Sequence, residues 1–310
     1  MDQPSFDPGL TQQYSARLRR TINKDGEFNV RRRGFTRRDL HAYLFLIHVR
    51  WHSFLGFMFG GFIGVNSIFA VIYAGIGIQH LHGAQAPTSW ERLLNCFFFS
   101  AHTLTTVGYG SIWPEGVLAN SIAAFEAMLG LMGFAVATGL LVARISRVSA
   151  RLGFSESAII APYGGGSSLQ FRLVNRGLSN LMELQARVLL MTVEEADGRL
   201  QRKYTGLKLE RETVLFLPLT WTVVHPIDRD SPLYGKTAAD LERLQAEFLI
   251  LIRAVNDTFS QSVYARYSYR YDEIVWGARF EPAFEVDDNG DLRLELDKVG
   301  AVARAPLEPA

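Results

Sequence analysis

A five-residue string at 106–110 could bind a cation, mainly through its backbone oxygens. Thr106-Val107-Gly108-Tyr109-Gly110 joins a hydroxyl-bearing Thr to two glycines. A loop of this composition can present a ladder of carbonyl oxygens that replaces the water shell of a potassium ion. The glycines matter because turning every carbonyl the same way needs backbone angles that most L-residues resist. The string therefore predicts a selectivity filter at 106–110, built from backbone oxygens and the Thr106 hydroxyl.

Two long apolar runs flank the string and would have to position it. Ser53–Gln79 has no charged residue, and residues 117–143 have only Glu126. Each run exceeds the roughly 20 residues that a helix needs to cross a bilayer. Between them, Leu93–Thr105 is apolar but too short to span, and such a half-crossing helix is tolerated only where protein or water covers its end. We expect a pore domain at 51–152, with an outer helix at 51–80, a pore helix at 93–105 and an inner helix at 117–147.

The distribution of charge gives the orientation. Lys and Arg crowd the first 50 residues and return directly after the second apolar run, whereas only Arg92 is basic between the two runs. By the positive-inside rule, both termini of this multi-pass chain are cytoplasmic. Residues 1–40 lack the apolar core of a cleavable signal peptide. The net charge of +1 gives no reason to expect a nucleic-acid partner.

The N-terminal region divides into two parts. Residues 1–35 are polar and basic, which predicts a mobile cytoplasmic arm. Residues 36–50 begin with a capping box of Thr36 and Asp39 and continue with apolar residues at helical spacing between basic ones. They predict an amphipathic helix lying along the inner membrane surface.

After residue 153 the hydrophobic period changes to two. Alternating apolar positions with turns between them predict half-buried strands of an antiparallel β-sandwich over 153–299, followed by a tail at 300–310. Thr237 and Asp240 form a capping box for one short helix. Asp287–Asp291 lacks the distal Glu of an EF-hand, so a hairpin turn is favoured over a calcium loop. The alternating positions are Leu169, Phe171 and Leu173; Leu184, Ala186, Val188 and Leu190; Val263, Ala265, Tyr267 and Tyr269; and Leu292, Leu294 and Leu296.

From about Arg37 to Pro282, the chain resembles the inward-rectifier potassium channels, most closely their prokaryotic branch. The resemblance implies a membrane α-helical pore domain with a C-terminal cytoplasmic immunoglobulin-like β-sandwich, in a bacterial inner membrane. Besides the filter, it rests on the strings Leu219-Thr220-Trp221-Thr222-Val223-Val224-His225-Pro226-Ile227-Asp228, Ser231-Pro232-Leu233, Ala265-Arg266-Tyr267-Ser268-Tyr269 and Glu273-Ile274-Val275-Trp276-Gly277.

One chain supplies one filter loop, and a single loop cannot surround an ion. Four copies around a closed axis are therefore expected, as in known potassium filters. Potassium ions are expected in the filter, and no cofactor is expected. The β-domain shows no nucleotide loop, metal-ligand cluster or nucleophile-base pair in its sequence, so no enzyme activity is expected.

The inner helix should line the cavity and form the gate. Stepping from Gly130 by about one turn gives Phe134, Thr138 and then Leu141 or Val142. The resemblance places the hydrophobic constriction at Val142; the alternative is that Leu141 and Val142 face lipid. In relatives that polyamines or magnesium block strongly, the position that matches Phe134 carries an acid. Because Phe134 is uncharged, the resemblance implies weak rectification here.

Two ionisable residues are candidates for supporting the filter. Glu126 is costly inside a membrane span, so it should either face the cavity or pack behind the pore helix. His102 stands where the resemblance leads us to expect an acid. It could make the filter pH-sensitive with Glu126 as partner, or be a neutral, hydrogen-bonded side chain.

Basic residues near the inner membrane surface could bind anionic phospholipid headgroups. The resemblance implies regulation by phosphoinositides, with inhibition expected in the prokaryotic branch. A plain positive-inside anchor is the alternative. The residues concerned are Arg37, Arg38, Arg144, Arg147 and Arg151.

Two other functions remain open at this point. A channel with this loop could fail to discriminate sodium from potassium. The chain could instead be a membrane-anchored sensory protein that binds a ligand in its sandwich and conducts nothing.

Overall fold

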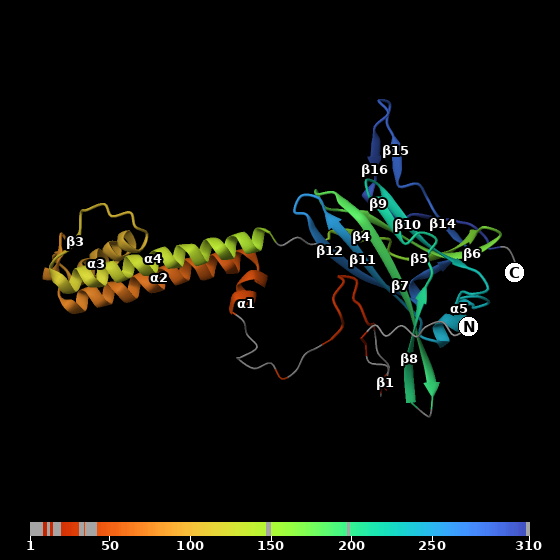
Figure 1. Cartoon of the computed structure of the whole chain (residues 1–310), viewed down its shortest axis with the longest axis horizontal. Coiled ribbons are helices and arrows are strands. Elements are labelled where there is room, and N and C mark those ends of the chain that lie inside the picture. Colours follow the sequence, from red (N-terminus) through yellow and green to blue (C-terminus); the bar gives the residue numbers. More distant parts are fainter. Residues whose placement is uncertain are drawn as a thin grey trace. The chain divides into compact units, whose positions relative to one another are not determined.

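The computed structural model describes residues 9–10, 13–14, 20–30, 34, 42–146, 150–196 and 199–307 (Figure 1). The chain forms two compact units, one of residues Arg32–Arg147 and one of Met1–Arg31 with Val148–Ala310. We call them the helical unit and the β unit. The predicted lipid contacts Arg37, Arg38 and Arg147, and the capping box of Thr36 and Asp39, lie outside the described residues.

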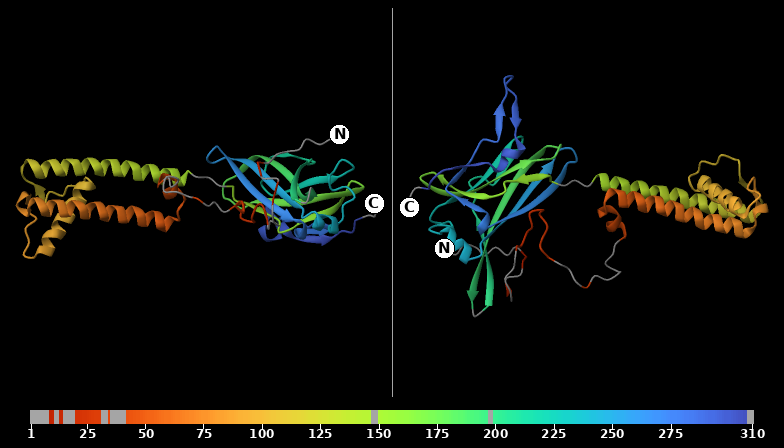
Figure 2. Two further views of the ribbon diagram at one scale, coloured as in Figure 1. Left: turned by 90° about the horizontal axis from the view of Figure 1, so that it is seen from below. Right: turned by 180° about the vertical axis from the view of Figure 1, so that it is seen from behind.

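Two long helices dominate the helical unit and run side by side (Figures 1 and 2). Both are long and apolar enough to cross a membrane. Most of their apolar side chains stay exposed in the single chain, as expected of helices whose solvent is lipid. The helices are α1 Ala42–His48, α2 Trp51–Ile76, α3 Ser89–Leu104 and α4 Gly116–Ile145, with a 3-10 turn η2 Ile78–His80 and a short pair of strands, β2 Leu81–His82 and β3 Trp113–Pro114.

The short helix α3 begins four residues earlier than the apolar pattern indicates. Thr88 accepts a hydrogen bond from the Glu91 amide at 3.2 Å, and the Glu91 carboxylate accepts one from the Thr88 amide at 3.3 Å. This capping box satisfies backbone groups at the start of α3. The prediction of a start at Leu93 was wrong because it followed hydrophobicity and overlooked the polar first turn.

The β unit is a sandwich of two sheets around one hydrophobic core. Among the described residues the pairing is antiparallel except between β5 and β13, which run parallel. The first sheet has the order β1 Gln13–Tyr14, β8 Arg199–Leu207, β7 Leu181–Ala196, β11 Glu247–Asn256 and β12 Gln261–Arg270, with β9 Thr213–Phe216 on β7. The second has the order β10 Thr220–Ile227, β6 Gly166–Asn175, β5 Ala158–Tyr163 and β13 Ile274–Trp276, with β4 Leu152–Phe154 on β6.

The period-two pattern is confirmed where the strands face this core. Leu169, Phe171 and Leu173 of β6 are buried, as are Leu184 and Val188 of β7. The predicted short helix is α5 Ala238–Arg243, with Thr237 and Asp240 in a capping box. The elements outside the two sheets are α5, the 3-10 turns η3 Tyr271–Glu273 and η4 Leu296–Gly300, and the strands β14 Ala278–Phe280, β15 Phe284–Val286, β16 Leu292–Leu294 and β17 Val302–Arg304.

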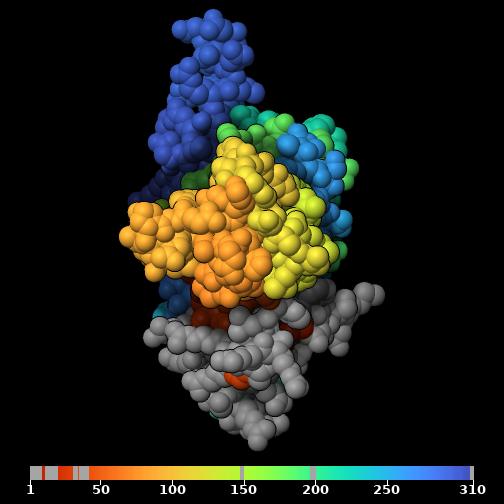
Figure 3. All heavy atoms as spheres, turned by 90° about the vertical axis from the view of Figure 1, so that its left-hand side faces the viewer, coloured from red at the N-terminus to blue at the C-terminus, as the bar shows by residue number. Residues whose placement is uncertain are grey.

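The pattern fails at the last hairpin. Strands β15 and β16 pair with each other and stand clear of the two sheets (Figures 1 and 3). Leu292 of β16 is therefore exposed instead of half-buried, and Leu296, which begins the 3-10 turn η4, is exposed as well. The predicted hairpin turn is confirmed: the Asp287 carboxylate accepts from the amides of Asn289 and Asp291, and Gly290 has φ +89°.

The described part of the N-terminal arm is docked on the β unit. The carboxylate of Glu247, which is 2% exposed, accepts hydrogen bonds from the amides of Thr21 at 3.0 Å and Ile22 at 3.4 Å. Arg20 forms an ion pair with Glu273 at 2.6 Å, and Lys24 forms another at 2.9 Å. The prediction of a mobile arm was wrong for residues 20–30, because the buried carboxylate of Glu247 on β11 needs hydrogen-bond donors, and the amides of Thr21 and Ile22 provide them.

The docked segment lowers the pKa of Glu273. Burial opposes its ionisation, but hydrogen bonds from Arg20, the Arg270 amide and Lys24 outweigh burial and hold its pKa below the usual value for glutamate. Its ionised form therefore stabilises the docked state at neutral pH, and that contribution is lost as the pH falls through the depressed pKa.

Replacing Glu273 by Gln should loosen the docked segment. We expect a loss of about 1–3 kcal/mol of docking stability at neutral pH, because charge-assisted hydrogen bonds to two cations disappear. Hydrogen–deuterium exchange of amides 20–30 in the full chain measures this. The difference from wild type should shrink when the pH falls below the pKa of Glu273.

The matched control is Glu194→Gln, which removes an exposed ion pair with Lys203 at 3.9 Å on the same unit. This exposed pair should contribute little. Equal exchange rates in wild type and Glu273→Gln at neutral pH would contradict the docking role.

Candidate functional site

The loop predicted to bind cations follows the end of α3. Both of its glycines adopt left-handed backbone angles, with φ +55° at Gly108 and +76° at Gly110, and Thr106 has φ +61°. The positive φ at Thr106 is a strained conformation for a β-branched residue. The loop residues are exposed, including Val107 at 52% and Tyr109 at 74%. A single chain thus leaves the loop on an open surface of its own unit.

His102 supports this loop in two ways. Its backbone carbonyl accepts hydrogen bonds from the amides of Val107 at 2.9 Å and Gly108 at 3.3 Å. Its ring meets the Tyr109 ring edge-on, with centroids 4.8 Å apart. The last turn of α3 and the loop are therefore joined through one residue.

Glu126 does not pair with His102 as the sequence suggested. Its side chain is fully buried, and its two carboxyl oxygens contact the hydroxyls of Tyr73, at 2.7 Å, and Ser100. Ser100 and His102 are two residues apart on α3, so their side chains point about 200° apart around the helix axis. Of the two alternatives for Glu126, the structure shows packing behind α3.

The sequence missed three of the residues in this buried cluster. Asn66 lies within the apolar run of α2, and its amide oxygen is 2.9 Å from the Ser100 hydroxyl. Tyr73 is fully buried, with 0% of its surface accessible. A polar amide inside a span was a usable signal, because it needs a partner away from water. Ser100 and Tyr73 gave none, since both types are common in such helices.

The sequence predicted that Gly130 lines the cavity, but the structure shows it in a contact between two helices. It is buried, and a Cβ atom added there would overlap the Leu104 carbonyl oxygen. The inner helix α4 therefore approaches the last turn of α3 as closely as a glycine permits.

The other predicted cavity and gate residues lie on the open surface of α4. Phe134 is 75% exposed, Leu141 39% and Val142 55%, and Thr138 is also exposed. Their side chains are free to meet neighbouring copies of the chain or lipid.

Arg144 has structural partners near the end of α4. Its guanidinium donates to the carbonyls of Ile47 at 3.0 Å and Val49 at 2.7 Å, and also to that of Leu46. It also lies over the ring of Trp51, with 4.9 Å to the centroid. These bonds attach the end of α4 to the carbonyl end of α1, where a cation is favourable. Arg151 is exposed.

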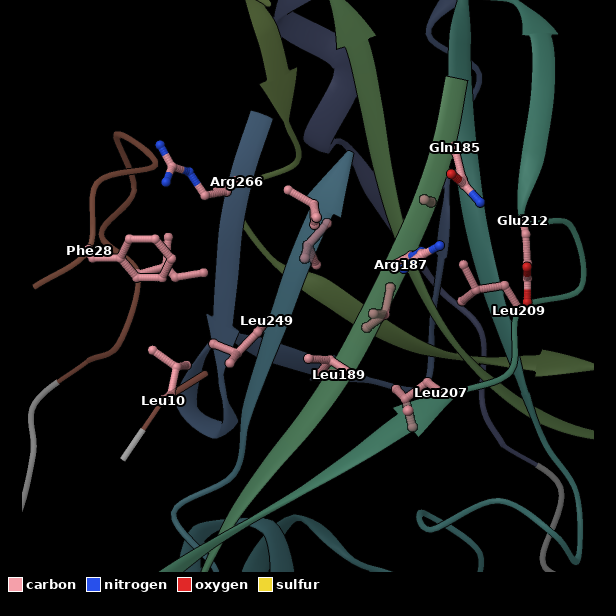
Figure 4. A pocket seen from close by; sticks show the side chains of 16 residues that line it. Leu10, Phe28, Gln185, Arg187, Leu189, Leu207, Leu209, Glu212, Leu249 and Arg266 are labelled. Atoms are coloured by element: carbon pink, nitrogen blue, oxygen red, sulfur yellow. The ribbon is translucent and has the colours of Figure 1, made fainter. Parts of the chain in front are cut away.

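Two further features belong to the β unit. A cavity of about 560 Å³ lies where the docked segment meets the outer face of β7 and β11, and its lining is mostly aliphatic (Figure 4). Both ring nitrogens of His225 are engaged, by the Lys208 carbonyl at 2.6 Å and the Ser231 hydroxyl at 2.8 Å, and burial lowers its pKa. Among the described residues, no three His, Cys, Asp or Glu could hold a metal ion together.

Comparisons with known proteins agree with this division. A family model described as inward rectifier potassium channel C-terminal domain matches residues 152–309, and one described as ion channel matches residues 62–147. The inward rectifier potassium channel Kirbac3.1 of Paramagnetospirillum magnetotacticum is 36% identical over 93% of this chain and 97% of its own. Human inward rectifier potassium channel 18 is 26% identical over 87% of this chain and 67% of its own. Mouse G protein-activated inward rectifier potassium channel 3 is 28% identical, over 92% and 78%.

A structural search also pairs the chain with a DNA glycosylase of Pseudomonas fluorescens. The TM-score of 0.20 and the identity of 12%, over 63% of this chain and 50% of that one, are too low to indicate a shared fold.

The close approach at Gly130 is directly testable. Gly130→Ala should destabilise the helical unit by about 1–3 kcal/mol, because the new methyl group overlaps the Leu104 carbonyl and forces the helices apart. Thermal unfolding of the full chain in detergent measures the change. Gly133→Ala is the control, since nothing lies within 4 Å of its added Cβ. Similar melting temperatures for the two variants would contradict the packing role.

Proposed function

The chain belongs to the inward rectifier potassium channel family, in its prokaryotic branch, and from that membership we propose that it is a homotetrameric potassium channel. The observation that carries the proposal is the loop Thr106–Gly110, whose two glycines have left-handed angles and whose residues are exposed in one chain. Four such loops around an axis would surround a dehydrated potassium ion with carbonyl oxygens and the Thr106 hydroxyl. Potassium is the cargo, and the family acts as ion channels.

The protein is a membrane protein, and α2 and α4 are its candidate spans. Our proposal places it in a bacterial inner membrane with both termini cytoplasmic, because its basic residues flank the two apolar runs. In this arrangement, residues 36–50 lie along the inner membrane surface and 153–299 form a cytoplasmic regulatory domain.

The gate would be formed by the cytoplasmic half of α4. With four copies present, Phe134 and Thr138 would face the cavity and Val142 would form an apolar constriction that excludes water. Support comes from the exposure of these side chains, which contrasts with the buried Gly130 and Leu140 on the same helix.

Anionic phospholipids would regulate this gate, with an inhibitory effect. The headgroup contacts in this proposal are Arg37, Arg38, Arg147 and Arg151. Arg144 has a different task in it: its bonds to the α1 carbonyls transmit a movement of the surface helix to the end of α4.

Rubidium uptake tests the channel. Liposomes containing the purified tetramer should accumulate radioactive rubidium, with block by barium, little competition from sodium and lower uptake when phosphoinositide is added. Gly108→Ala should reduce uptake by roughly tenfold or more, because an L-residue at φ +55° costs about 1–2 kcal/mol per loop and four loops share the strain.

The control is Gly164→Ala in the β unit, which has the same type of backbone angle, φ +56°, and the same open space around it. It should conduct as wild type does. A pure tetramer that passes no rubidium in any lipid would refute the channel, and equal competition by sodium would indicate a non-selective one.

Weak rectification is a second expected property. Because Phe134 is uncharged, cytoplasmic spermine should block the current weakly and with little dependence on voltage. Phe134→Asp should increase the affinity for spermine by roughly tenfold or more, through four added carboxylates in the cavity. Strong voltage-dependent block of the wild type in planar bilayers would contradict the assignment of Phe134.

A further inference from the structure

A chain of buried hydrogen bonds crosses the three large helices of the helical unit behind the loop. It runs from Tyr73 of α2 to Glu126 of α4, then to Ser100 of α3, and back to Asn66 of α2. All four side chains are 0% exposed in the single chain. Water therefore does not complete their hydrogen bonding, and their donors and acceptors have to balance among themselves.

The orientation of Asn66 fixes the first proton. Its amide nitrogen donates to the Phe62 carbonyl at 2.7 Å, and that carbonyl only accepts. Rotating the amide would bring two oxygens together at this position, so the amide oxygen of Asn66 must face Ser100. Ser100 then has to donate its single hydroxyl proton to Asn66, at 2.9 Å.

Ser100 consequently has only lone pairs left for Glu126. An ionised carboxylate also has only lone pairs, so an ionised Glu126 would place two acceptors in contact. A proton on the Glu126 oxygen that faces Ser100 removes the conflict. The other oxygen still accepts from the Tyr73 hydroxyl at 2.7 Å. We propose that Glu126 is a neutral, protonated acid, and that it positions helix α3 through one directed chain of hydrogen bonds.

The surroundings of Glu126 agree with a neutral group. The titratable side chains buried with it are Tyr73 of α2 and Cys96 of α3, and neither carries positive charge. Within the described residues, its recorded partners are two hydroxyl groups and no cation. An unpaired carboxylate would lose its hydration there without compensation.

The chain of bonds acts on the loop through α3, which is where this inference rests on the proposed function. Ser100 is two residues before His102, whose carbonyl holds the amides of Val107 and Gly108. Glu126 is thus a positioning residue for potassium selectivity. It acts by donating a hydrogen bond to Ser100 and accepting one from Tyr73, and it adds no negative charge behind the ions.

Infrared spectroscopy tests the proton without any ion flux. The full chain in a detergent that contains no ester or acid groups should show, at neutral pH, the carbonyl stretch of a protonated carboxylic acid, and Glu126→Gln should remove it. The control is Glu247→Gln, which changes a 2% exposed glutamate whose oxygens accept from backbone amides. That variant should keep the band. A wild type without the band, or a band that survives in Glu126→Gln, would overturn the proposal.

Flux measurements test the positioning role. The side chain of Gln has an oxygen to accept from Tyr73 and an amide to donate to Ser100, so Glu126→Gln should keep rubidium uptake and sodium discrimination within about twofold of wild type. Tyr73→Phe and Glu126→Ala should each weaken discrimination by roughly tenfold, because a buried partner loses its bond. Loss of discrimination in Glu126→Gln, equal to that in Glu126→Ala, would show that a charge is needed and overturn the inference.

The two proposals fail separately. A tetramer that shows the infrared band but passes no rubidium would refute the channel and support the protonated acid. A conducting tetramer without the band would do the reverse.

Discussion

A polar group that leaves water must find its partner inside the protein, and this constraint organises the helical unit. An unsatisfied donor or acceptor in an apolar environment costs several kcal/mol, which is a large fraction of the net stability of a domain. The carboxyl group of Glu126 meets the constraint with hydroxyl groups from two other helices, and the two terminal guanidinium nitrogens of Arg144 meet it with carbonyls at the end of α1. Each of these solutions also fixes the position of a backbone segment.

Helix α3 shows how these solutions combine. Its first turn is closed by the capping box of Thr88 and Glu91, its middle is attached to α2 and α4 through Ser100, and its last turn lies against Gly130. The loop Thr106–Gly110 is held to the last turn of α3 by the His102 carbonyl, which accepts from the amides of Val107 and Gly108. The geometry of the loop Thr106–Gly110 is therefore set by the position of α3. We expect substitutions far from the loop, such as those at Tyr73 or Gly130, to act on it through this helix.

The β unit follows the same rule with charged groups. Glu247 and Glu273 provide acceptors that residues 20–24 occupy, so the N-terminal segment is part of the β unit although it precedes the helical unit in sequence. The helical unit is consequently joined to the β unit at both of its chain ends. A change in the β unit has two covalent routes to the helices, one toward α1 and one from the end of α4.

The sequence by itself determined the class of the protein and most of its elements. Local composition is enough to find the two apolar runs, the Thr106–Gly110 string and the period-two strands such as β6. The spacing of apolar residues along the chain indicates which face of a helix or strand is turned away from water. Only the tertiary structure decided where the isolated polar groups go. It placed Glu126 behind α3 instead of beside His102, gave Gly130 to a helix contact, docked residues 20–30 and left Leu292 and Leu296 exposed. The partners in these contacts are distant in sequence, and no local pattern specifies which donor meets which acceptor once the helices and sheets are packed.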